Sequence, residues 1–209
     1  MNDTCMNGMS RREFGKLMGM GTLVLSIGAS VFTAGCSIVS DIANWGPLGL
    51  TAFNTIITLL ETAGFIPAAA IVAVVRAAFA QLIADCKQYE AIQPPPVGLL
   101  AEIRAAFVII VSNFQNILSS LAAPIGPFLT LIVGLAQVVF DTIAGFESQL
   151  GPAPAGQALV PGRVQVGQRT IQVTPTLRSR RAFKHVWNSV CAASGYPNAE
   201  MPVSFWERF

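Results

Sequence analysis

The residues best suited to chemistry in this chain are its single histidine and its four cysteines. His185 and Cys191 are six positions apart, so on a helix they lie on different faces and do not form a nucleophile with its base. Neither a CxxC nor an HExxH pattern occurs, whereas zinc sites and acid–base catalysis usually need several such side chains. We therefore expect no enzymatic activity, no bound metal and no cofactor.

A second use of thiols is a disulfide bond. Cys86 and Cys191 are the two cysteines outside the first 36 residues. In an oxidising compartment they are candidates for a bond that would tie the C-terminal region to the rest of the chain. The alternative is that each thiol is a small buried apolar group.

The densest charged cluster lies near the C-terminus. It consists of Arg178, Arg180, Arg181 and Lys184. Such a cluster is typical of contact with anionic lipid headgroups or with an acidic protein partner. The alternatives are a solvated surface, or pairing with acidic residues of the same chain.

The N-terminus carries a motif for export. Residues 10–16 resemble the twin-arginine (Tat) signal, Ser-Arg-Arg-x-Phe-x-Lys, and all five fixed positions are matched by Ser10, Arg11, Arg12, Phe14 and Lys16. The apolar stretch 17–32 follows, diluted by glycine and serine as in Tat leaders, and it is shorter than the ~20 residues that span a bilayer. The resemblance implies passage through the Tat translocase, with ordinary secretion as the alternative.

Residues 33–36 resemble a bacterial lipobox. The sequence Thr-Ala-Gly-Cys places small residues before Cys36, whose thiol would receive the diacylglycerol, while Thr33 stands where leucine is usual. Ser37 stands where an aspartate would imply retention in the inner membrane, so the resemblance to Gram-negative lipoproteins favours the outer membrane. The alternatives are a Tat leader that is cut elsewhere and an uncleaved anchor helix.

Composition divides the chain into four segments. We expect a signal peptide at 1–35, a helical bundle at 36–150, a Pro/Gly linker at 151–162 and a basic aromatic tail at 163–209. The chain is 53% hydrophobic and 11% charged, which is unusual for a soluble surface. Residues 41–150 have a net charge of −4 and residues 151–209 one of +5. The two regions could dock on each other, and a partner nucleic acid is not expected outside the cytoplasm.

Hydrophobic periodicity predicts four helices, at about 48–62, 67–90, 99–121 and 127–150. Short Pro/Gly connections favour an antiparallel four-helix bundle. In the fourth helix the weakly apolar positions form one narrow stripe: Gly126, Thr130, Gly134, Gln137, Asp141, Gly145 and Ser148. Such a helix is either the buried centre of a bundle or faces lipid. We favour a bundle that faces water over one that spans a membrane.

The tail is predicted to fold as a hairpin and a short helix. Residues 163–166 and 169–174 alternate around Gly167-Gln168, a two-residue loop suited to a tight turn. Phe183, Val186 and Trp187 begin the apolar face of the helix, which ends near Gly195. An isolated hairpin is only marginally stable, so we expect the tail to dock on the bundle or on a partner.

These observations predict a mainly α, non-catalytic lipoprotein of the cell envelope that faces the periplasm. Its expected partners are the membrane, through the lipid anchor, and a protein of the envelope. Two alternatives stay open: a carrier that holds an apolar ligand between its helices, and a membrane-inserting or pore-like protein.

Overall fold

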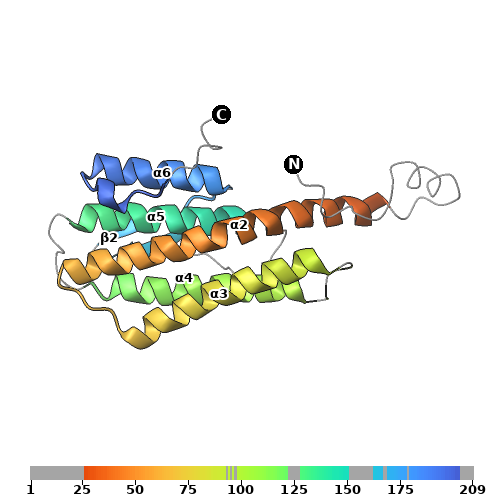
Figure 1. Ribbon diagram of the computed structural model, residues 1–209, viewed down its shortest axis with the longest axis horizontal. Helices are drawn as coiled ribbons and strands as arrows, with labels where there is room; N and C mark the ends of the chain where they lie inside the picture. Colours follow the sequence, from red (N-terminus) through yellow and green to blue (C-terminus); the bar gives the residue numbers. More distant parts are fainter. Residues whose placement is uncertain are drawn as a thin grey trace, which may run out of the picture.

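The computed structural model describes residues 26–92, 94, 96, 98–121, 128–150, 162–166, 169–177 and 179–202. Its elements in chain order are α2 (Ser26–Thr62), α3 (Ala69–Ala91), α4 (Leu99–Ser119), α5 (Phe128–Glu147), β1 (Arg163–Val166), β2 (Arg169–Gln172), α6 (Arg180–Ala193) and the 3-10 turn η2 (Pro197–Ala199). Four long helices pack together, followed by a two-stranded antiparallel hairpin and a short helix (Figure 1). The predicted fold class is confirmed.

The ends of the inner helices follow the turn signals of the sequence. Gly64 ends the turn after α2 with a φ of +85°, and Gly98 precedes α4 with a φ of +99°. Glycine adopts these left-handed conformations without the steric penalty of a Cβ atom. The predicted bounds of α3, α4 and α5 therefore differ from the observed ones by only a few residues.

The start of α2 differs from the prediction. The helix begins at Ser26 rather than near residue 48, and it projects beyond the bundle in Figure 1. Pro47 lies inside the helix, where proline removes one backbone hydrogen bond. Packing offsets this loss, because Ile38, Val39 and Ile42 are buried in the core ahead of the proline.

Trp45 occupies the centre of the core. Its ring is fully buried, and its centroid lies 5.9 Å from Phe79, 6.4 Å from Phe107, 5.5 Å from Phe146 and 5.9 Å from Phe183. These four rings come from α3, α4, α5 and α6, so one side chain of α2 contacts every other long element and the tail. Aromatic pairs of this kind contribute about 0.5–1.5 kcal/mol each beyond burial.

Two glycines allow α2 and α3 to pack closely. A Cβ atom at Gly46 would lie 2.6 Å from Cγ1 of Ile83, and one at Gly49 would lie 2.7 Å from Cε1 of Phe79. Both distances are shorter than real Cβ contacts allow. The pair of glycines therefore fixes the register in which these two antiparallel helices pack.

The tail covers the polar stripe of α5. Gln137 donates from Nε2 to the Gln172 carbonyl at 2.6 Å, and Asp141 accepts the Thr174 N–H at 2.8 Å. A Cβ atom at Gly134 would lie 2.7 Å from Cγ1 of Val190 on α6. Helix α5 is thus the buried centre of the bundle, one of the two arrangements that its composition allows.

The hairpin packs one face inward. Its register pairs Val164 with Ile171 and Val166 with Arg169, which confirms the predicted alternation. Val164, Val166 and Ile171 are buried against the helices. The predicted turn residues Gly167 and Gln168 lie outside the described part of the chain. As predicted, the tail docks on the bundle, and α6 runs alongside α5 (Figure 1).

Candidate functional site

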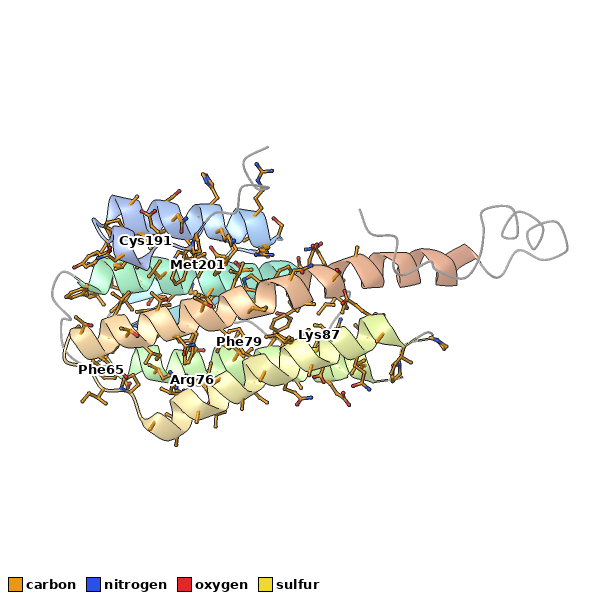
Figure 2. The ribbon with its side chains drawn as sticks, viewed as in Figure 1. Phe65, Arg76, Phe79, Lys87, Cys191 and Met201 are labelled. Carbon is orange, nitrogen blue, oxygen red and sulfur yellow. The ribbon has the colours of Figure 1, made fainter. Side chains whose placement is uncertain are left out.

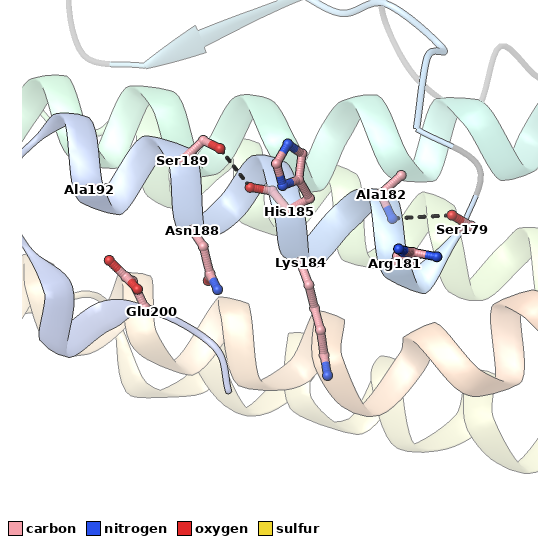
Figure 3. A pocket seen from close by; sticks show the side chains of 9 residues that line it. All are labelled: Ser179, Arg181, Ala182, Lys184, His185, Asn188, Ser189, Ala192 and Glu200. Atoms are coloured by element: carbon pink, nitrogen blue, oxygen red, sulfur yellow. Dashed lines mark hydrogen bonds between the residues drawn. The ribbon is translucent and has the colours of Figure 1, made fainter. Parts of the chain in front are cut away.

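A surface depression formed by described residues runs along α6. It has a volume of about 750 Å³ and lies between the helix and the C-terminal segment that follows η2 (Figure 3). It is lined by Ser179, Arg181, Ala182, Lys184, His185, Asn188, Ser189, Ala192 and Glu200. Most of these residues are of polar types. We call this depression the α6 groove, after the helix that supplies most of its lining.

Local capping and an apolar face position α6. Ser179 precedes the helix in an extended conformation, and its Oγ accepts the Ala182 N–H at 3.2 Å, which satisfies one donor of the first turn. Phe183, Trp187 and Cys191 are buried on the inner face, and Gly195 ends the following turn with a φ of +76°. The outer face is left to line the groove.

Side chains of α6 hold the C-terminal segment in place. Asn188 donates from Nδ2 to the Met201 carbonyl at 2.8 Å and accepts the Met201 N–H on Oδ1 at 2.7 Å. Trp187 donates from Nε1 to the Ala199 carbonyl at 2.8 Å. One wall of the groove is therefore fixed by hydrogen bonds rather than left as a free end.

The predicted basic cluster is divided in the structure. Arg180 and Arg181 are exposed, whereas Lys184 is only 5% exposed and donates from Nζ to the Pro202 carbonyl at 3.1 Å. Lys184 is thus held under the C-terminal segment and apart from the two exposed arginines, while the possible contact of the cluster with an anionic surface stays a prediction. Arg178 lies outside the described residues.

The polar residues of the groove do not converge on one point. In Figure 3 the Lys184 and Asn188 side chains extend to one side of α6 and the His185 ring to the other. Ser189 donates to the His185 backbone carbonyl at 2.9 Å rather than to the imidazole. His185 is exposed and Cys191 is buried, so they do lie on different faces as predicted. Among the described residues, the groove therefore offers separate polar contacts rather than one cluster of side chains.

The two thiols are free and buried. Cys191 lies on α6 and Cys86 next to Lys87 on α3, and Figure 2 shows these regions on opposite sides of the bundle. The possible disulfide between them is therefore not formed in this fold, and the alternative of two small buried groups describes the structure. Burial raises the pKa of Cys86 to about 12, with the charges of Glu90 and Asp85 adding to it. Burial and Glu200 raise the pKa of Cys191 to about 11.

Two notable polar groups were missed by sequence reasoning. Asp85 is 2% exposed, its Oδ1 accepts from Nε2 of Gln81 at 2.7 Å, and its Oδ2 has no hydrogen-bond partner within the described residues. Nε1 of the buried Trp45 has no such partner there either. An unpaired buried donor or acceptor destabilises a fold by about 1–3 kcal/mol. A carboxylate in a helical segment is usually solvent-exposed, so the residue type gave no signal for the burial of Asp85.

The export motif lies outside the described part of the chain. The motif consists of Ser10, Arg11, Arg12, Phe14 and Lys16. Cys36 falls within α2, where only the backbone is described.

The described side chains hold no group of three or more His, Cys, Asp or Glu residues placed to bind a metal ion. Helices α3, α4 and α5 are long and apolar enough to cross a membrane, by length and composition alone.

Comparisons with known proteins add no assignment. The chain matches no protein-family model, no curated protein and no solved structure at significance.

Proposed function

We propose that this protein is a non-catalytic lipoprotein of the cell envelope, exported by the Tat route and anchored through acyl chains on Cys36. The observation that carries this proposal is the joint placement of the N-terminal motifs and the core. The leader ends at residue 35, and the first buried side chains among the described ones, Ile38 and Val39, follow two and three residues after Cys36. Removal of residues 1–35 leaves the described bundle core intact.

The Tat route also suits the body of the protein. This translocase handles folded cargo, and the tail reaches the core through Phe183, whose ring packs on Trp45 at 5.9 Å. Such a contact joins residues that are far apart in the chain, so it is present only when the tail has docked on the bundle. The described part of the leader, residues 26–35, belongs to helix α2, which projects beyond the bundle, and this placement fits export in the folded state (Figure 1).

The molecular role that we propose is an interaction module. The α6 groove carries the exposed cation Arg181 at one end and the carboxylate of Glu200 at the other, on a wall fixed by Asn188. A groove with charges of opposite sign at its two ends suits a protein segment of the envelope.

The test is metabolic labelling with a radioactive fatty acid in cells that express the full chain. We expect label on the natural protein and none on Cys36→Ala, while Cys86→Ala keeps the label as the matched control. In parallel, Arg11→Lys with Arg12→Lys is expected to leave precursor in the cytoplasm. Label that persists in Cys36→Ala, or normal processing of the lysine pair, would contradict the proposal.

A membrane-inserted bundle is the second candidate. The apolar character of α3, α4 and α5 and the exposed side chain of Ile66 (82%) favour it. Alkaline carbonate extraction of Cys36→Ala separates the two candidates. The lipoprotein is released into the supernatant when its acyl chains are missing, whereas an inserted bundle still pellets with the membranes.

A further inference from the structure

The anchor residue and the folded core are joined without a flexible tether. Ser37 is the only residue between Cys36 and the core, because Ile38 is 2% exposed and Val39 fully buried. All of them belong to the continuous helix α2. Acyl chains on Cys36 would therefore hold one particular end of the bundle close to the bilayer.

The register of α2 and α3 identifies what else lies at this end. Gly46 of α2 packs on Ile83 of α3. Ser37 precedes Gly46 by nine residues and Ile92 follows Ile83 by nine residues, and both directions lead towards the anchor. At a rise of about 1.5 Å per residue, each is about 14 Å along its helix from the crossing. Ile92, which is 42% exposed, therefore lies level with Ser37.

Helix α6 directs its basic first turn towards the same end. Gly134 packs on Val190 and Phe128 on Tyr196, so α5 and α6 are antiparallel. Because α5 is also antiparallel to α2, α6 runs parallel to α2, with Phe183 level with Trp45. The exposed Arg181 precedes Phe183 and thus lies nearer to the anchor.

From this geometry we propose that the end of the bundle marked by Ser37, Ile92 and Arg181 rests on the surface of the membrane that holds the lipid anchor. We call it the anchor end. At this end Ile92 would lie at the boundary between headgroups and acyl chains, and the guanidinium of Arg181 would be attracted to anionic headgroups. The inference rests on the proposed lipidation of Cys36. It adds a fixed orientation, with the α2–α3 connection at Ile66 pointing away from the membrane.

Site-specific fluorescence tests this orientation. Ile92→Cys and Ile66→Cys, each labelled with the same fluorophore, are matched exposed positions at opposite ends. Residues 37 and 62 of α2 are about 38 Å apart along the helix. Cys86 and Cys191 are buried and have pKa values of about 12 and 11, so they stay mostly protonated and unlabelled near neutral pH. The acylated mature protein is placed in phosphatidylethanolamine/phosphatidylglycerol vesicles that carry nitroxide-labelled headgroups.

We expect the nitroxide lipids to quench the probe at 92 and to leave the probe at 66 at its emission without nitroxide. Quenching of both probes alike, or of neither, would overturn the inference. The mass of the N-terminal peptide from the same vesicles shows whether Cys36 carries acyl chains. Acylated protein without quenching at 92 overturns the orientation alone, whereas absence of the acyl mass overturns the proposed function.

A linker insertion sharpens the test. Ten Gly/Ser residues inserted between Ser37 and Ile38 span about 17 Å on average and would uncouple the anchor from the bundle. If the orientation depends on the short, helical link between Cys36 and the core, the insertion abolishes most of the quenching at 92 while acylation is retained. Unchanged quenching at 92 would overturn the role of the short link to Cys36 and show that other contacts of this end set the orientation.

Discussion

Helices α3 and α5 have equal mean hydropathy over their most apolar stretches, yet they occupy opposite environments. Helix α5 exposes only Thr130 between its ends, because other helices and the tail surround it. Helix α3 exposes one whole face, which is built largely from alanine: Ala69, Ala70, Ala73, Ala77, Ala80 and Ala84. Alanine raises the mean hydropathy but offers little surface to bury.

The difference teaches that mean hydropathy does not report burial. What separates the two helices is the size of the side chains opposite the core. Helix α5 places Leu, Ile, Val and Phe around most of its circumference, so several neighbours are needed to cover it. Helix α3 places its large side chains on one face only, where α2 and α4 pack.

The largest expected effect comes from placing the same charge on both helices. Ala136 of α5 is fully buried and Ala77 of α3 is exposed. Ala136→Arg buries an unpaired guanidinium and is expected to destabilise the fold by at least about 3 kcal/mol. Ala77→Arg is expected to stay within about 0.5 kcal/mol of the parent. Urea unfolding of the Cys36→Ser mature form, followed by circular dichroism, measures both.

Equal destabilisation by the two arginines would break the comparison, since it would mean that α3 is covered on its alanine face. The corresponding measurement in cells is membrane extraction of the lipidated protein. A change in extraction for Ala77→Arg alone would favour the membrane-inserted candidate.

A smaller effect is expected where the tail meets α5. Gly134→Val would place Cβ 2.7 Å from Cγ1 of Val190, too close for a relaxed contact. Overpacking of this kind typically destabilises by about 1–3 kcal/mol. Val190→Ala removes the opposing methyl groups, so the double variant should recover part of the loss. A double-mutant cycle by urea unfolding checks this, and strict additivity of the two changes would contradict the contact.

The sequence predicted the repetitive parts of this fold well. Periods of three and four residues, with glycine and proline in the connections, placed α3, α4 and α5, and alternation placed the hairpin. The start of the first helix was predicted at about residue 48, which is too late; the Gly46-Pro47 pair just before it is of a kind that usually ends a helix, yet here it lies inside one. The pattern of Ile38, Ile42 and Trp45 leading into Phe53 was the signal for the longer helix.

The candidate site was less predictable than the fold. The basic cluster could be read from the sequence, but the burial of Lys184 depends on the Pro202 carbonyl, which the C-terminal segment brings back along α6. Likewise, Asp141 finds its partner at Thr174, across a long connection. Such contacts follow from tertiary docking, and no local pattern contains them.

The smallest expected effect is the pH dependence of this docking contact. Burial raises the pKa of Asp141, although hydrogen bonds from the Thr174 N–H and from Gln137 lower it in part. A raised pKa in the folded state means that the folded protein binds more protons than the unfolded chain. Stability from this group is therefore present below the ordinary aspartate pKa of 3.8 and is lost as pH rises through the folded value.

Asp141→Asn separates the charge from the hydrogen bonds. The amide oxygen can still accept from the Thr174 N–H, which Oδ1 of Asp141 now accepts at 2.8 Å, while the buried charge is gone. We expect the variant to lose this pH dependence and to gain slightly in stability at neutral pH, measured by urea unfolding from acidic to neutral pH. Asp41→Asn is the control, because burial raises the pKa of Asp41 too, without a hydrogen bond to the tail among the causes. Parallel curves for Asp141→Asn and the parent would mean that water, not the tail, surrounds this carboxylate, and the stripe of α5 would then be open.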